Sequence, residues 1–269
     1  MIEFIEVSYD YYGQIGVKDI NLKIEEGRWV SLIGANGSGK TTLLKLINGL
    51  LKPKKGDVLV DGINTKNVKT SFLSRKVGFV FQNPDYYLFS NSVLDEVMFA
   101  PRNFKSSDPR RCAKEAIDRL GLNKYVGRSP LELSEGERER VAIASVLSYK
   151  PKYILLDEPT KGMDYRRKLE FSKILMKLIE DGHTVVVASH DVEWVADNSD
   201  KIAVLHKGEI IANGPMELLS KDVILNKASL IKPQTIEICE TLDLEVKCRF
   251  KEVSKECLSI KQKIQSFTR

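Results

Sequence analysis

The sequence lacks any long apolar run. No stretch approaches the roughly 18 consecutive apolar residues that a membrane-spanning helix requires, so a partner in a membrane would be met from one side. A strong charge of one sign is also missing, because 42 Lys and Arg against 37 Asp and Glu leave a formal charge of only +5. That excess is too small to indicate nucleic-acid binding. With 42% hydrophobic and 29% charged residues, the composition excludes disordered and fibrous classes and predicts a globular core.

Cysteine is scarce as well. The four cysteines lack CxxC spacing and are too few to cross-link 269 residues, so we expect reduced thiols. They are Cys112, Cys239, Cys248 and Cys257. A metal site built from the last three is a minor alternative. Acidic residues stand near the N-terminus where a secretory signal needs basic ones, which predicts a protein that stays in the cytosol.

The first part of the chain has the pattern of strands. Apolar and polar residues alternate over residues 4–7 and 20–24, which is typical of half-buried antiparallel strands. A short apolar run, 29–33, then ends abruptly at Gly34. Leucines at helical spacing predict a helix over residues 40–50.

Strand signals are scarce from about residue 90 to 149. Asp108 is a good N-cap, Pro109 fits the first helical position and Gly121 a helix end, so the spacing predicts a helix over 109–120. This part of the chain therefore reads as a helical segment inserted between two groups of strands.

Strands return after the helical segment. Residues 153–156 and 184–188 have the apolar composition of buried strands, and the helical pattern of 167–180 between them predicts a parallel sheet. A hairpin over 202–211 follows. In the tail, alternation over 242–250 and helical spacing over 253–267 predict an extended piece followed by an amphipathic helix, which serves either as a contact surface or as part of its own core.

A glycine-rich loop supplies the first chemical signal. Gly34-Ala35-Asn36-Gly37-Ser38-Gly39-Lys40-Thr41 fits the GxxxxGK[ST] pattern between a predicted strand and a predicted helix. Glycines let the backbone N–H groups wrap around phosphate oxygens, and the helix N-terminus adds positive potential. Lys40 would reach the terminal phosphates, and Thr41 would hold Mg²⁺ through its hydroxyl.

Two carboxylates follow the buried strand at 153–156. Because the carboxyl ends of parallel strands lie at the ligand-binding edge of a sheet, Asp157 and Glu158 are placed beside the phosphate loop. Asp157 is expected to hold Mg²⁺. Glu158 is expected to orient and partly deprotonate the water that attacks the γ-phosphate.

Taken in order, these residues resemble the ATP-binding cassette (ABC) ATPase family over residues 4–215. The further matches are Gln82 at the Q-loop, Leu133-Ser134-Glu135-Gly136-Glu137 at the LSGGQ signature, Asp164 in the D-loop and Ser189-His190 at the switch histidine. The resemblance implies that ATP and Mg²⁺ are bound, with Gln82 near the metal and His190, Gln82, Glu158 and Lys40 catalytic. It also implies ATP contacts from residues 34–41 and Thr42, and from Ser134 and Gly136 of the opposite subunit in a head-to-tail dimer.

Two points of the resemblance leave alternatives open. An aromatic residue near the N-terminus is expected to stack on adenine; Tyr11 is the best candidate, and Tyr9 and Tyr12 compete with it. The signature carries Glu135 and Glu137 where the family has glycine and glutamine. Ser134 and Glu137 also form an S-x-x-E capping box. Two roles are therefore open for Ser134: it caps its own helix, or it makes a weaker but working contact with the nucleotide of the opposite subunit.

A narrower resemblance is to the ATPases of energy-coupling factor (ECF) transporters. It rests on Val80-Phe-Gln-Asn-Pro-Asp85, on the segment from Leu88 to Asn103, and on Lys232-Pro-Gln234. It implies uptake of cobalt, nickel or a vitamin, with a transmembrane coupling protein and a separate substrate-binding membrane protein as partners. Asp95 and Glu96 are the candidates for meeting the coupling protein. A soluble non-transport ABC protein and a regulatory nucleotide switch are the alternatives.

The expected fold class is α/β. It is a P-loop NTPase with a RecA-like mixed core sheet, an N-terminal antiparallel β subdomain, a helical subdomain at about 88–150 and a mainly helical C-terminal extension. We expect residues 1–216 to form the cassette and 217–269 to help the chain form a homo- or heterodimer. The expected location is the cytoplasmic face of the cell membrane, as a peripheral protein without nucleic-acid partners.

Overall fold

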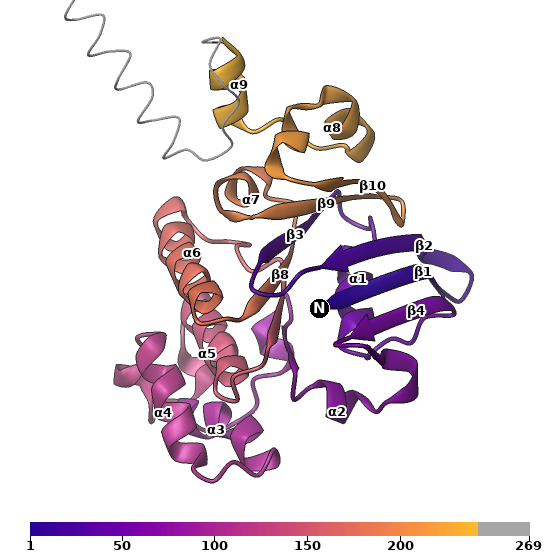
Figure 1. The fold of residues 1–269 in the computed structure, drawn as a ribbon. Helices are drawn as coiled ribbons and strands as arrows, with labels where there is room; N and C mark the ends of the chain where they lie inside the picture. The colour runs from indigo at the N-terminus through magenta and orange to yellow at the C-terminus, as the bar shows by residue number, and fades with distance from the viewer. Residues whose placement is uncertain (242–269) are drawn as a thin grey trace, which may run out of the picture.

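The computed structural model describes residues 1–241. The predicted extended piece and amphipathic helix after residue 241, together with Cys248 and Cys257, lie outside the described residues. Two sheets form within the described part (Figure 1). The larger contains β3 (Trp29–Ile33), β6 (Val77–Val80), β7 (Tyr153–Asp157), β8 (Thr184–Ser189), β9 (Lys201–His206) and β10 (Glu209–Gly214). The smaller contains β1 (Ile2–Tyr11), β2 (Gln14–Ile24), β4 (Lys55–Val60) and β5 (Ile63–Asn64).

The larger sheet is the predicted mixed core sheet. Its strand order is β10-β9-β3-β8-β7-β6, with parallel pairing from β9 through β6 and an antiparallel edge strand, β10. Every residue of β3 is buried, because Trp29 and Ile33 enter the core on one face of the sheet and Val30 and Leu32 the core on the other. Burial on both faces explains the uninterrupted apolar runs that the sequence shows at β3, β7 and β8.

The smaller sheet confirms the predicted antiparallel β subdomain. β1 pairs antiparallel with β2 and with β4, in the order β2-β1-β4-β5. The sequence pattern does not predict the strand β4. Val58 and Val60 are the buried positions of this segment, which is too short a pattern to predict a strand. The strand is stabilised by its pairing with β1.

The helices flank the core sheet. They are α1 (Lys40–Ile47), α2 (Thr70–Leu73), α3 (Val93–Asn103), α4 (Pro109–Arg119), α5 (Glu135–Leu147), α6 (Tyr165–Glu180), α7 (Val192–Asn198), α8 (Asp222–Ala228) and α9 (Gln234–Thr241). Short 3₁₀ turns lie at Thr65–Asn67, Pro84–Tyr86, Asn123–Tyr125, Pro130–Glu132 and Met216–Ser220. Helix α1 ends three residues before the predicted position. The Asn48 side chain accepts the Leu50 N–H at 2.9 Å and Gly49 adopts φ +74°, which together stop the helix.

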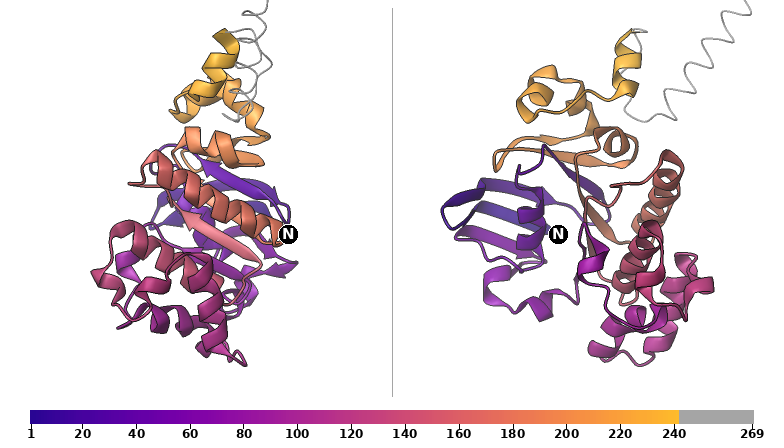
Figure 2. Two further views of the ribbon diagram at one scale, coloured as in Figure 1. Left: turned by 90° about the vertical axis from the view of Figure 1, so that its left-hand side faces the viewer. Right: turned by 180° about the vertical axis from the view of Figure 1, so that it is seen from behind.

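The helical segment between β6 and β7 has the expected form. α3 and α4 gather at the end of the molecule opposite α8 and α9, well apart from the four-stranded sheet (Figures 1 and 2). Asp108 caps α4 as predicted, accepting the Arg111 N–H at 2.9 Å, and Gly121 closes it with φ +65°. Among the described residues, no helix is both long and apolar enough to cross a membrane.

Candidate nucleotide site

The glycine-rich loop joins β3 to α1 at the carboxyl edge of the core sheet. Gly34 has φ +153°, and a Cβ there would lie 2.3 Å from the Leu205 carbonyl oxygen. Gly39 has φ +108°, and its Cβ would lie 2.7 Å from the Gly16 carbonyl oxygen. Both the left-handed backbone and the close approach require glycine, so the loop is held as a cradle whose N–H groups can surround a phosphate.

Lys40 begins α1 and turns back over this loop. Its ammonium donates to the carbonyl oxygens of Gly34 at 2.8 Å and Ala35 at 3.2 Å. It also lies 3.6 Å from the Glu158 carboxylate, and both side chains are less than one-tenth exposed. Burial lowers the pKa of Lys40, and the charge of Glu158 opposes that shift. A phosphate group would satisfy the same ammonium better than two carbonyl oxygens do.

Two of the expected Mg²⁺ ligands, Thr41 at the start of α1 and Asp157 at the end of β7, are hydrogen-bonded to each other. The Thr41 hydroxyl donates to Asp157 at 2.9 Å from Oδ2 and 3.0 Å from Oδ1. Burial raises the pKa of Asp157, and the Thr41 hydrogen bond opposes that shift. Ser38 adds a buried hydroxyl oxygen that has no hydrogen-bond partner within the described residues. Mg²⁺ prefers oxygen ligands. The Thr41 hydroxyl, the Asp157 carboxylate and the unpaired Ser38 hydroxyl lie at the phosphate loop, so this group of oxygens fits Mg²⁺ bound together with a nucleotide phosphate.

Glu158 and His190 directly follow two adjacent strands, β7 and β8. His190 Nδ1 lies 2.7 Å from Glu158 Oε2, and the same oxygen accepts the His190 N–H at 3.3 Å. Glu158 has φ +51°, a left-handed conformation that is costly for a residue with a side chain. The strained backbone is held by the Glu158 N–H, which donates to the Ala188 carbonyl oxygen at 2.8 Å. A carboxylate so fixed beside an imidazole can orient a water and accept its proton.

A cleft of about 580 Å³ brings most of the predicted residues together. Its walls are Tyr11, Gln14, Ile15, Gly16, residues 36–42, Gln82, Glu158, Lys161 and His190. Tyr11 places its hydroxyl 3.4 Å from Thr42 Oγ1, whereas Tyr12 is fully exposed and Tyr9 packs edge-on against Tyr11. Sequence reasoning missed Gln14, Ile15 and Gly16, which follow the β1–β2 turn, and Lys161. The available signal for Gln14, Ile15 and Gly16 was their position in the sequence shortly after Tyr11.

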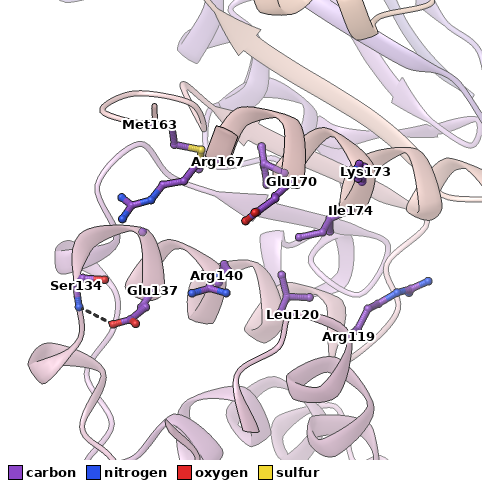
Figure 3. A pocket seen from close by; sticks show the side chains of 12 residues that line it. Arg119, Leu120, Ser134, Glu137, Arg140, Met163, Arg167, Glu170, Lys173 and Ile174 are labelled. Atoms are coloured by element: carbon purple, nitrogen blue, oxygen red, sulfur yellow. Dashed lines mark hydrogen bonds between the residues drawn. The ribbon is translucent and has the colours of Figure 1, made fainter. Parts of the chain in front are cut away.

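Ser134 and Gly136 lie away from that cleft. Both belong to the N-terminus of α5 and border a different cavity, beside α6 (Figure 3). The expected capping box is present: the Ser134 N–H donates to Glu137 Oε2 at 3.0 Å, and Ser134 caps the helix in return. A hydrogen bond from the Tyr125 hydroxyl is the main cause that lowers the pKa of Glu137. Within one chain, therefore, the signature residues do not complete the nucleotide cleft.

The remaining predicted residues have local partners. Asp164 caps α6, accepting the Arg167 N–H at 2.8 Å. Asp95 lies in the first turn of α3 and is half exposed, with an Arg102 guanidinium 3.4 Å away. Glu96 is only 4% exposed and accepts the N–H groups of Phe89 at 3.0 Å and Ser90 at 2.8 Å. Its carboxylate is thus engaged by its own chain.

The fold and the cleft together define a class of protein, the P-loop ATPases. The nucleotide site lies at the carboxyl edge of a mixed sheet. An antiparallel β subdomain lies on one side, and a helical subdomain is inserted after β6. Comparison with known proteins places the chain within that class. It belongs to the ABC transporter family, whose model matches residues 17–161. The chain is therefore an ATP-binding ABC ATPase.

Individual relatives cover nearly the whole chain. A putative ABC transporter ATP-binding protein of Pyrococcus abyssi is 44% identical over 247 residues, covering 91% of this chain and 94% of the relative. The energy-coupling factor transporter ATP-binding protein EcfA of Methanothermobacter thermautotrophicus is 38% identical, covering 97% and 87%. Among solved structures, cbiO1 from Clostridium perfringens, described as part of the ABC transporter complex cbiONQ, aligns with a TM-score of 0.77 at 32% identity, covering 90% and 98%.

Proposed function

We propose that this chain is the ATP-hydrolysing subunit of an ECF-type importer for cobalt, nickel or a vitamin. Its place is the cytoplasmic face of the cell membrane, and its partners are a second ATPase subunit, a transmembrane coupling protein and a substrate-binding membrane protein. The similarity to EcfA and to a subunit of cbiONQ supports this assignment and favours it over a soluble ABC protein or a nucleotide switch.

At the nucleotide, each polar group has a proposed role. Lys40 and the loop N–H groups bind the β- and γ-phosphates, and Tyr11 stacks on adenine. Thr41, Asp157 and Gln82 would hold Mg²⁺, which supplies charge neutralisation at the phosphates. The Glu158 carboxylate accepts the proton of the attacking water. His190, 2.7 Å from that carboxylate, orients it.

The separation of Ser134 from the cleft supports a two-chain site. A second copy or a related subunit, placed head to tail, would bring its α5 N-terminus to the γ-phosphate. Glu135 and Glu137 sit in that helix turn and oppose the phosphate charge, so the contact depends on Ser134 and Gly136. Residues 217–269 are proposed to help hold the two chains together.

The observation that carries the transporter role is a set of exposed aromatic side chains in the segment that follows Gln82 in the chain. Phe89 and Phe99 meet edge to face at 4.9 Å and are 62% and 48% exposed, and Tyr86 is 87% exposed. A buried carboxylate, Glu96, shapes the loop that presents Phe89. Large exposed apolar patches mark contact sites, and this one carries Asp95 in the adjoining helix turn. We propose that a helix of the coupling protein docks here, with an arginine facing Asp95.

Co-purification from membranes tests the proposal. Asp95→Arg and Phe89→Ser are expected to abolish recovery of transmembrane chains with the tagged protein, while nucleotide binding is unchanged. Asp118→Arg on α4, a charge reversal on another surface, is the matched control and should leave recovery unchanged. Recovery of the same transmembrane chains with the Asp95 and Phe89 variants would refute docking at this surface.

A further inference from the structure

A second cavity lies between α5 and α6, away from the nucleotide cleft. Its volume is about 360 Å³, within the range of small-molecule sites. Three elements form it: the end of α4, one side of α5 and the facing side of α6 with the loop before it (Figure 3). The nucleotide chemistry described above uses only its rim, at Ser134 and Gly136.

The cavity has an apolar wall. Leu120 and Phe171 are each 3% exposed, and Met163 and Ile174 are half-buried. Figure 3 shows Ile174 of α6 and Leu120 projecting toward each other across the gap between the helices. An apolar ring system or short aliphatic chain would be removed from water against these side chains.

Positive charge dominates the polar wall. Four cations border the cavity, namely Arg119, Arg140, Arg167 and Lys173, against two carboxylates, Glu137 and Glu170. The carboxylates are already engaged. Glu137 is held in the capping box and by the Tyr125 hydroxyl, and Glu170 pairs with Arg166 at 3.4 Å.

Two of the four cations are engaged as well. Arg119 pairs with Asp181, and Arg167 with Asp164 at 3.6 Å. In the described part of the chain, neither Arg140 nor Lys173 has a carboxylate within 4.0 Å, although the charge of Arg140 contributes to lowering the pKa of Glu137. Arg140 lies on α5 and Lys173 on α6, so the two cations reach the cavity from different helices.

We propose that this cavity binds a small organic anion. A carboxylate, sulfonate or phosphate group lies between Arg140 and Lys173, and an apolar body packs on Leu120, Phe171 and Ile174. The ligand bridges α5, which begins at the signature, and α6, which follows the D-loop. The site is independent of the ECF assignment, because its detection requires neither transport nor a membrane partner.

Fluorescence titration of the full-length chain with anilinonaphthalene sulfonate tests the proposal. This probe joins an apolar ring system to one anionic group and emits strongly when its rings leave water. Saturating MgADP is present throughout to occupy the nucleotide cleft. Arg140→Met and Lys173→Met are each expected to raise the dissociation constant roughly five- to tenfold, because each removes a charged partner of the sulfonate.

A cavity-filling variant and two controls make the result specific. Ile174→Trp should abolish the same signal by occupying the apolar wall, with folding checked by circular dichroism. Lys177→Met, one turn further along α6, and Phe99→Ser, on the exposed aromatic surface, should leave the titration unchanged. The proposal fails if MgADP abolishes binding, if Phe99→Ser removes it, or if Arg140→Met and Lys173→Met bind as the wild type does. Loss of the signal on dimerisation would instead assign the cavity to a second copy of this chain.

Discussion

At the scale of single residues, Glu158 is the most constrained side chain of the nucleotide cleft. It occupies a left-handed conformation, it is 8% exposed, and its carboxylate lies between the Lys40 ammonium and the His190 imidazole. A fold retains such strain only when the surrounding contacts enforce it. The position of this carboxylate, rather than its type alone, is what suits it to activate water.

We therefore expect Glu158→Gln to lower the rate of ATP hydrolysis by roughly 10²- to 10⁴-fold, the usual contribution of a general base. ATP binding should persist or strengthen, because the amide no longer competes with phosphate for the charge of Lys40. Phosphate release and equilibrium ATP binding measure the two effects separately. Glu209→Gln, an exposed glutamate on β10, is the control. A turnover within a few-fold of wild type would contradict the role given to Glu158.

At the scale of elements, α5 combines a cap with an unfavourable charge pattern. Ser134 and Glu137 close its first turn, while Glu135 and Glu139 are like charges one turn apart. Burial, with a smaller effect of Glu135, raises the pKa of Glu139 to about 8. The folded state therefore holds a proton that the unfolded chain releases near its ordinary pKa of 4.5. This contribution to stability is complete below about pH 4.5 and is lost as the pH rises through 8.

Glu139→Gln keeps the neutral form at every pH. We expect it to raise the free energy of unfolding by about 1–2 kcal/mol near pH 9, a value discounted for the partial exposure of the side chain, and to change little near pH 5. Urea unfolding at the two pH values measures the difference. Glu132→Gln, on the exposed turn before α5, supplies the control. Equal shifts at both pH values would mean that Glu139 does not titrate in this range.

At the scale of the whole molecule, the residues proposed to act on ATP are divided between two surfaces. Lys40, Glu158 and His190 line the cleft, whereas Ser134 and Gly136 stand at the start of α5 beside another cavity. If two chains complete each other's sites, defects at the two surfaces will complement one another.

Mixing two inactive variants measures that complementation. Lys40→Ala and Ser134→Arg should each hydrolyse little ATP alone. Their mixture should regain roughly a quarter of wild-type activity, since random pairing makes about half of the dimers mixed and each mixed dimer keeps one intact site. A mixture no more active than the average of its components would contradict a shared site. Mixing Lys40→Ala with Glu158→Gln, two defects of the same surface, is the matched control and should restore nothing.

Local patterns determined much of this protein in advance. The strand-loop-helix order around Lys40, the carboxylates that end β7 and the cap of α4 are each specified by a few consecutive residues, because backbone conformation at such positions depends on glycine, on capping side chains and on apolar periodicity. The same holds for the alternating strand patterns at residues 4–7 and 20–24, which lie within β1 and β2. These features were predictable, and the structure contains them.

Only the tertiary structure decided how distant segments meet. It paired β4 with β1, brought Gln14 and Lys161 into the nucleotide cleft, and placed Arg140 and Lys173 at the wall of one cavity. Each of these depends on long-range packing, in which the partner of a side chain lies on another element at an unspecified sequence separation. The modest charge and the absence of a spanning segment in the sequence left the partners open. The exposure of Phe89 and Phe99 and the position of the signature outside the nucleotide cleft of its own chain are properties of the folded chain.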